Sequence, residues 1–491
     1  MSAREAASAA NRFGLGAKPG ELSAASDARG WLHAQLRKQP ASTAFQGLPN
    51  SLELLRREAA YQQLRRMQKD DTDPAPTSAQ MPDMAAGAPM APAKKPLSPE
   101  RRELTQLGLA DIAARYRYAV TTDQPFVERL VRFWSNHFAV SIDKSTARLY
   151  AAPMEREAIR PHVLGRFGDM LLAVETHPAM LRYLDNVASV GGDSKLVHWQ
   201  AVRAQRNAGN GDDGMPMRKL GLNENLAREI MELHTLGVNG GYTQADVTEF
   251  ARAITGWSVP APRQLTDARS GFVFRANAHE PGARRIMGKQ YAEDGEGQGR
   301  AVLRDLAMHP ATARHLSLKL ARHFVADAPP DALVRRMAKA YLDSGGQLVA
   351  LYAALVDDDA AWAPAARKFK TPDDFVVSAM RAGGFTLDQR PGSLPNLLRE
   401  LGQPVFTPRS PAGFPDTTGD WAAGDALRKR LQIAKTFANR VTGDRTPLQM
   451  ANEALGEAAV RGDFASMLQR AGSPREGYAL LFASPAFQWR I

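Results

Sequence analysis

Apolar residues recur three and four positions apart along most of the chain, which is the spacing of one face of an α-helix. Ser98-Pro99-Glu100 is typical of a helix start, because serine caps the first turn and proline fits its geometry. The pattern predicts helices over residues 28–38, 51–68, 98–120, 125–138, 222–236, 244–255, 301–306, 310–325, 331–343 and 425–441. The fold is therefore predicted to be mainly α, a large multi-helix domain.

Four segments break this pattern. Residues 272–291 carry the runs FVF and RRIMG on either side of Glu280-Pro281-Gly282, which predicts a small β-hairpin. Residues 190–221 and 402–420 are polar or rich in Pro and Gly, so we expect long irregular loops there, the second of them lining a cleft. Residues 69–97 are rich in Pro, Ala and Met, a composition that builds no core and predicts a disordered loop.

These interruptions predict the domain organisation. Residues 1–68 form an N-terminal helical segment, residues 69–97 the disordered loop, and residues 98–491 the main helical domain. We expect the N-terminal helices to pack on the main domain, because they are too few to bury a core alone.

The helix predicted over 222–236 carries a carboxylate where an apolar residue is expected. On a helical wheel Glu229 falls in the middle of the apolar arc, and His234 falls at its edge. A buried carboxylate must be paired, hydrogen-bonded, neutralised or bound to a metal. Glu229 is thus compatible with a structural pair to a buried Arg or His, with a catalytic or metal-binding role, or with a position exposed after all.

A second helix, over 125–138, places His137 inside its own apolar arc. His137 and Glu229 are therefore candidates to meet, as a structural clamp, an acid/base pair or part of a metal shell. The alternative for His137 is an ordinary core histidine. We take Glu229, His137 and His234 as the candidate catalytic residues.

Other polar residues are candidates for binding. Glu224, Arg228 and Glu232 form an i, i+4, i+8 stripe, in which Glu224 and Arg228 have the polarity of a helix salt bridge. His323 lies at the margin of the core face of the helix over 310–325. The binding candidates are Glu224, Asn225, Arg228, Glu232, His323, Arg409 and Ser410. By contrast, His177 and His309 each precede a proline that opens a helix, so we predict that they are caps.

Composition narrows the chemistry. The chain has no cysteine, which excludes disulfides and thiol catalysis and leaves His, Asp and Glu as ligands for any metal. Its net charge of +11 favours anionic partners, but the basic residues are spread among acidic ones and no nucleic-acid-binding motif is present, so nucleic acid is not expected. No apolar run is long enough to span a bilayer, and residues 1–16 lack a signal core. We expect a cytoplasmic protein, or a periplasmic one if a leader has been removed.

Several familiar motifs fail on inspection. Residues 282–290, GARRIMGKQ, have one residue too many between the glycines for a phosphate-binding loop, and they end in Gln290 where Ser or Thr would bind magnesium. Gly14-Leu15-Gly16 lacks both the preceding strand and the third glycine of a dinucleotide site. Zincin, hydrolase-elbow and ferritin-type di-iron motifs are not found in the sequence.

Six segments carry a family resemblance. They read NRFGLGAKPGEL, FWSNHF, GLNENLAREIMELHTLGVNGGYTQADVTEFARAITGW, HPATARHLSLKLARHFVAD with Pro329-Pro330, SPAGFPD and LLFASPAFQWR. Together and in this order they resemble the bacterial family called domain of unknown function 1800, over nearly the whole chain. The resemblance implies a largely helical protein, often exported, whose gene often neighbours one for a sulfatase-like or phosphatase-like protein. It supplies no catalytic residue.

Three functions stay open at this point. The first is an enzyme with a Glu/His site, with or without a His/carboxylate-bound metal, in a cleft between the helix over 222–236, the FWSNHF helix and the SPAGFPD loop. The second is a non-catalytic helical binding or assembly protein, acting with the product of a neighbouring sulfatase-like gene. The third is a binder of an anionic polymer.

Overall fold

The computed structural model describes residues 3–40, 43–70, 98–209, 220–364, 366–387 and 392–490. It is mainly α, as predicted, with three short antiparallel strand pairs among the described residues. Most of the predicted disordered loop, residues 71–97, lies outside the described residues. No described helix is long and apolar enough to cross a membrane.

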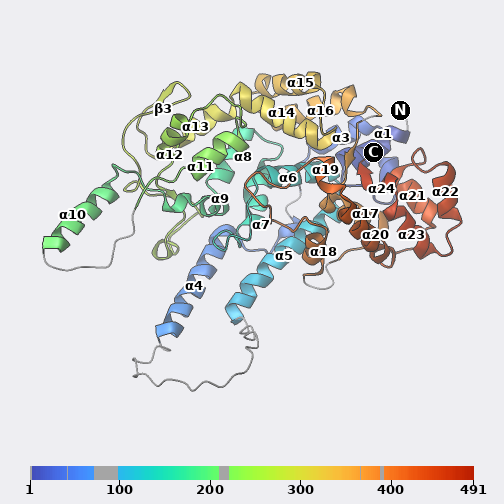
Figure 1. Ribbon diagram of the computed structural model, residues 1–491, viewed down its shortest axis with the longest axis horizontal. Coiled ribbons are helices and arrows are strands. Elements are labelled where there is room, and N and C mark those ends of the chain that lie inside the picture. Colours follow the sequence, from blue (N-terminus) through green and yellow to red (C-terminus); the bar gives the residue numbers. More distant parts are fainter. Residues whose placement is uncertain are drawn as a thin grey trace, which may run out of the picture.

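The helical elements follow one another along the chain, and the longest described loops precede α7 and α19 (Figure 1). In the first part of the chain they are α1 (Ala3–Ser8), η1 (Ala9–Phe13), α2 (Glu21–Ala24), α3 (Ala28–Leu36), η2 (Thr43–Phe45), α4 (Ser51–Asp70), α5 (Pro99–Thr121), α6 (Pro125–His137), α7 (Ala151–Met154), η3 (Glu155–Ile159), η4 (Arg160–His162), α8 (Phe167–Glu175), α9 (Pro178–Tyr183), η5 (Asn186–Ala188) and α10 (Lys195–Gly209). The central part holds α11 (Asn225–Glu229), η6 (Ile230–His234), α12 (Gln244–Ala253), η7 (Pro262–Gln264), α13 (Glu296–Ala307), α14 (Pro310–Phe324), α15 (Asp331–Asp343), α16 (Leu348–Asp357) and η8 (Asp359–Ala361). The last part holds α17 (Pro372–Gly383), α18 (Ser393–Glu400), α19 (Thr418–Trp421), α20 (Gly424–Ala438), α21 (Pro447–Leu455), α22 (Gly462–Gln469), α23 (Pro474–Ala483) and α24 (Pro485–Gln488).

The predicted helices are present and end within three residues of the predicted ends, except that α13 already begins at Glu296. Local capping explains this agreement. The side chains of His177 and His309 accept hydrogen bonds from the backbone N–H groups of Ala179 and Ala311, so their prediction as caps is confirmed.

One predicted loop contains a helix. Residues 195–209 of the expected irregular stretch 190–221 form α10, which projects away from the body of the molecule (Figure 1). Its single large apolar residue on the outside, Trp199, is 57% exposed. The sequence of α10 lies between the polar, Gly-rich runs GGDS and NAGNGDDG, which made the whole stretch look irregular.

The predicted hairpin exists, but its pairing differs. β3 (Arg284–Ile286) pairs with β4 (Lys289–Tyr291), and Met287 and Gly288, both with positive φ, form the two-residue turn. β2 (Val273–Phe274) pairs instead with β1 (Trp257–Ser258), which follows α12. The turn therefore lies at Met287-Gly288 and not at Glu280-Pro281-Gly282. The third pair joins β5 (Lys368–Phe369) to β6 (Trp489–Arg490).

Two large hydrophobic clusters form the interior. The first contains side chains from η1, α3, α6, α8, α13, α14 and α16, and the second contains side chains from α17 to α24. Buried ion pairs connect the two clusters: Asp374 of α17 binds Arg129 of α6 and Arg490 of β6, and Arg381 of α17 binds Glu21. Ion pairing is what allows these charges to be buried between the apolar layers.

The N-terminal residues are tied into both clusters. Asn11 Nδ2 donates to Ala454 O over 2.9 Å, and Arg12 Nη1 donates to Ala361 O over 2.5 Å. Arg381 Nε donates to Gly16 O over 2.7 Å. Residues 11–16 therefore share hydrogen bonds with segments more than 340 residues away in sequence.

Candidate functional site

Helix α6 presents two different faces. Phe133 and His137 point into the first hydrophobic cluster, where the His137 ring stacks on Phe133 with centroids 6.2 Å apart. Arg132 and Asn136, which directly precede Phe133 and His137, lie on the side of α6 that faces residues 403–414. The FWSNHF motif thus contributes side chains to a buried histidine cluster on one face of α6 and to a polar pocket on the other.

The histidine cluster is closed to solvent. His137 Nε2 donates to the backbone carbonyl of His234 over 3.1 Å, and His234 Nδ1 donates to the Glu175 carboxylate over 2.8 Å. His137 is 2% exposed, and His234 and Glu175 are 0% exposed. The structure therefore brings together two of the three predicted catalytic residues, His137 and His234, in a buried contact between α6, η6 and α8.

Glu175 was not among the predicted site residues. It stands eight residues after Phe167 and four after Leu171, both fully buried, so it shares their face of α8. This is the same signal that singled out Glu229, a carboxylate in phase with an apolar arc.

Burial disfavours the charged forms of His137 and His315. Desolvation, with the charges of Lys319, His234 and His315 acting in the same direction, lowers the pKa of His137 well below its usual value. Desolvation likewise lowers the pKa of His315 to about 4, and His315 Nε2 donates to Leu233 O over 3.1 Å. The pKa of Lys319 falls to about 8 for the same reason.

Glu229 does not reach His137. No hydrogen bond or ion pair joins its carboxylate to any described residue, and the side chain is only half-buried. Desolvation raises its pKa. The difference from the prediction arises in η6, where the helix widens to a π-turn directly after Glu229 and shifts the later residues around the axis. His234 is thereby turned fully inward, while Glu229 stays at the edge of the buried face.

The stripe of polar residues on α11 connects that helix to its neighbour. Glu224 accepts from Arg228 Nη2 over 3.0 Å and from Gln244 and Thr248 of α12 over 2.8 and 2.7 Å. Burial, with the charge of Glu232 adding to it, raises the pKa of Tyr242, whereas Asn225 is exposed. These contacts account for the stripe without a ligand.

The remaining binding candidates lie apart from one another. His323 packs its ring 5.3 Å from that of Phe133, and desolvation lowers its pKa well below the usual value. Arg409 and Ser410 are exposed on the loop before Phe414 and do not line the pocket described next.

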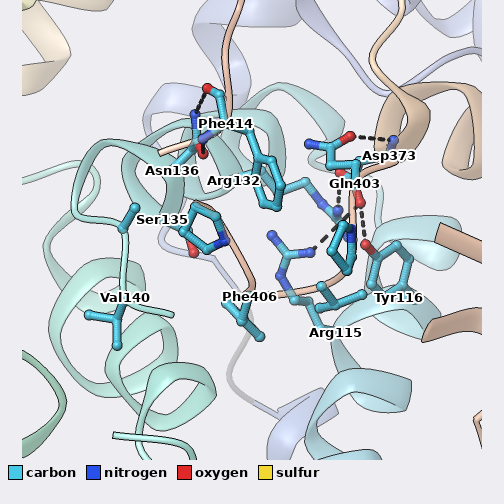
Figure 2. A pocket seen from close by; sticks show the side chains of 14 residues that line it. Arg115, Tyr116, Arg132, Ser135, Asn136, Val140, Asp373, Gln403, Phe406 and Phe414 are labelled. Carbon is cyan, nitrogen blue, oxygen red and sulfur yellow. Dashed lines mark hydrogen bonds and ion pairs between the residues drawn. The ribbon is translucent and has the colours of Figure 1, made fainter. Parts of the chain in front are cut away.

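A polar pocket lies between α5, α6, α17 and the 403–414 loop (Figure 2). Its volume is about 80 Å³. The expectation that the 402–420 loop lines a cleft is confirmed, since residues 403–406, 408 and 414 form one wall. The loop is fastened to α6 by Asn136, whose amide hydrogen-bonds both backbone groups of Phe414.

Asp373 is the acidic residue of the pocket wall. Its carboxylate accepts from Arg132 Nη1 over 2.6 Å and from the Tyr116 hydroxyl, and it lies 3.9 Å from Arg115 Nη1. Burial alone would raise the pKa of Asp373, but Arg132 and Arg115 hold it below its ordinary value. Burial, with Asp373 adding to it, raises the pKa of Tyr116. Both groups therefore keep one protonation state around neutral pH, which suits binding better than proton transfer.

Three side chains of the wall carry donor atoms that have no hydrogen-bond acceptor among the described residues: Ser135 (Oγ), Gln403 (Nε2) and Arg115 (both Nη atoms). The Arg115 side chain is only 10% exposed, and its Nε is occupied by Glu155 over 2.7 Å. Figure 2 shows the guanidinium among the side chains lining the pocket, with one edge directed at Asp373. None of these three residues was predicted from the sequence, although Arg115 shares a face of α5 with buried Ile112 and Ala119.

The family model for the protein of unknown function DUF1800 matches residues 8–489. The chain belongs to this family. A search of the curated proteins and a search of the solved structures found no match. In this DUF1800 protein, FWSNHF and SPAGFPD, two of the motifs that carried the resemblance, meet at the Asn136–Phe414 contact beside the pocket. Within the described residues no group of three or more His, Asp or Glu side chains is placed to hold a metal ion.

Proposed function

We propose that this DUF1800 protein binds a small anionic group, a carboxylate, phosphate or sulfate, in the pocket between α5, α6, α17 and the 403–414 loop. The observation that carries the proposal is the Arg115 guanidinium at the pocket wall: its side chain is only 10% exposed, its Nη1 lies 3.9 Å from Asp373, and neither Nη atom donates a hydrogen bond to a described residue. A guanidinium with free donors in a polar pocket is suited to bind an anion through charge-assisted hydrogen bonds.

The size and charge of the pocket support this reading. One water molecule needs about 10–15 Å³ of cavity, so about 80 Å³ leaves room for an anion of four or five heavy atoms. Asp373 repels such an anion little, because Arg132 and Tyr116 already neutralise and hydrogen-bond its carboxylate. Ser135 and Gln403 add neutral donors.

The experiment is thermal unfolding and calorimetric titration with phosphate, sulfate and acetate, against chloride at equal ionic strength. Wild-type protein is expected to bind at least one of the three, and Arg115→Met, which keeps most of the volume but loses the donors, to lose that binding. Arg156→Met is the matched control, since Arg156 makes a bidentate pair with Asp111 and does not line the pocket. Unchanged binding by Arg115→Met, or none by the wild type, would refute the proposal.

The enzyme hypothesis built on Glu229, His137 and His234 stays a prediction. The full burial of the two histidines favours a structural role for them. The partnership with a sulfatase-like neighbour also stays a prediction, and an anionic-group pocket is compatible with it.

A further inference from the structure

A second, larger cavity opens next to the polar pocket that Arg115, Ser135 and Gln403 line, here called the anion pocket. It is a groove of about 530 Å³ between α4, α5 and residues 142–152. Figure 1 shows the two helices projecting together from the body of the molecule. The groove is lined mainly by apolar side chains: Leu54, Leu104, Leu107, Ile112, Ile142 and Leu149.

The acidic residues of the groove are already neutralised. Glu58 accepts from the Tyr150 hydroxyl and from Arg182, each over 2.6 Å, and Asp111 is held by Arg156. The basic residues at the edge of the groove have no such partners. Arg65, Arg101 and Arg148 line the groove, are exposed, and have no acidic partner among the described residues. The groove therefore combines an apolar floor with unpaired positive charge at its rim, which attracts an anionic amphiphile.

The groove and the anion pocket are neighbours along the same three segments. On α5 the groove is lined by Ile112 and the pocket by Arg115 and Tyr116, the next turn of the same helix. After α6 the pocket is lined by Val140 and the groove by Ile142. On the loop, Phe406 lines both.

Phe406 is held between the two cavities. Its φ of +48° is in the left-handed region, which a bulky residue adopts only when its surroundings impose it. The Ile142 N–H donates to its carbonyl over 2.8 Å, and its ring lies 5.2 Å from Arg115 Cζ. Phe406 thus stacks on the cation that faces the polar pocket and also lines the apolar groove.

We propose that the ligand is an amphipathic acid, with its anionic head on Arg115 and an unbranched alkyl tail in the α4–α5 groove, bending past Phe406. This inference rests on the proposed anion site and names the class of its ligand. A groove of about 530 Å³ is in the range of small-molecule sites. The shared chemistry is an acid head on a long chain, and carboxylate and phosphate heads are separated by the test.

The test is calorimetric titration of the full-length protein with acetate, octanoate and laurate, and with phosphate, octyl phosphate and dodecyl phosphate, all below their micelle concentrations. Affinity is expected to rise about three- to fourfold for each methylene until the groove is full. Whichever series binds more tightly identifies the head group. Dodecanol, which lacks the charge, is expected to bind more weakly than both acids.

A groove-blocking variant completes the test. Gly108 of α5 lines the groove and a Cβ there meets no atom within 4 Å, so Gly108→Leu adds a bulky side chain at the groove without a clash at its Cβ. It is expected to remove the gain from chain length and to leave acetate and phosphate binding unchanged. Gly424→Leu, equally open and outside the groove, is the control.

The outcomes separate the two proposals. If short anions bind through Arg115 but chain length adds nothing, or Gly108→Leu changes nothing, the tail is refuted and the anion site stands. If laurate binds equally well to Arg115→Met, the head does not lie at Arg115 and this inference fails. If a helical peptide is the true occupant of the groove, no alkyl probe gains affinity from its chain, which also refutes it.

Discussion

The side-chain amide of Asn136 hydrogen-bonds both backbone polar groups of Phe414. Its Nδ2 donates to Phe414 O over 2.9 Å, and Phe414 N donates to its Oδ1 over 2.8 Å. The asparagine side chain thus makes the two backbone hydrogen bonds that a neighbouring β-strand would make to this residue of the loop. It fixes the wall of the anion pocket to the helix that carries Arg132, so the shape of the pocket depends on how closely the two segments approach.

That approach requires glycine at position 413. Gly413 has a φ of +86°, and a Cβ there would lie 2.3 Å from the backbone oxygen of Asn136. Gly413→Ala is therefore expected to cost about 1–3 kcal/mol of unfolding free energy and to make the loop more sensitive to proteolysis. Urea denaturation and limited proteolysis measure the two effects. Gly419→Ala, where a Cβ meets nothing within 4 Å, is the control and should change neither.

Two glutamates of the histidine region are expected to respond in opposite directions. Glu175→Leu leaves His234 Nδ1 buried without an acceptor, at a cost of about 1–3 kcal/mol. Glu229→Gln removes a carboxylate whose pKa is raised by desolvation, so the unfolding free energy at pH 7 should stay the same or increase. Chemical denaturation at pH 7 measures the unfolding free energies of both variants against the wild type. A large loss of stability in Glu229→Gln would show that its charge is needed.

The buried His137 predicts how stability depends on pH. Its pKa is depressed in the folded state by desolvation and by nearby positive charge, so the unfolded chain binds the proton more readily. Its contribution is fully present above the unfolded pKa of about 6.5 and is lost as pH falls below that value. The slope for this one group is about 1.4 kcal/mol per pH unit. Unfolding free energies at pH 7.5 and 5.5 should therefore differ by less in His137→Asn than in the wild type; an equal difference would contradict the assignment.

Asp374 and Glu21 both join the two hydrophobic clusters through ion pairs. Of these two carboxylates, we expect the removal of Asp374 to lower the unfolding free energy more. Asp374 accepts from Arg129 Nη1 over 2.7 Å and from Arg490 Nε over 3.0 Å, and Asp374→Asn leaves both guanidinium groups buried with a neutral partner. The expected loss of unfolding free energy is about 3–5 kcal/mol. Asp425→Asn breaks an exposed pair with Arg428 and should leave the denaturation midpoint unchanged. Equal midpoints for the two variants would contradict the ranking.

The sequence was most informative where structure is local. Helix spacing and caps such as His177 and His309 involve residues within a few positions of each other, so the pattern alone predicts them. α10 was missed because polar, Gly-rich runs flank it on both sides. The strand pairing was predicted wrongly because Val273–Phe274 pairs with Trp257–Ser258, which precedes the hairpin in sequence. This pairing depends on tertiary packing, which the local sequence does not show.

The candidate site was only half predictable for the same reason. A polar residue on an apolar arc, such as His137, signals burial but not its partner, and the partner of His234 lies 59 residues away in sequence. Arg115, Ser135 and Gln403 meet only through the packing of α5 and α6 against a loop that follows them by more than 250 residues. No spacing rule in the sequence joins these segments.

The hydrogen bonds of residues 11–16 have a consequence for how the chain matures. Asn11 needs the carbonyl of Ala454, and Gly16 needs Arg381, yet the ribosome makes the acceptor and donor partners of this segment hundreds of residues later. A domain that folded step by step during synthesis would leave the buried polar groups of its first turn unsatisfied for most of translation. We therefore expect the native state to close late, after α21 has emerged, and fragments that stop before that helix to bind chaperones and to be digested by protease faster than the full chain.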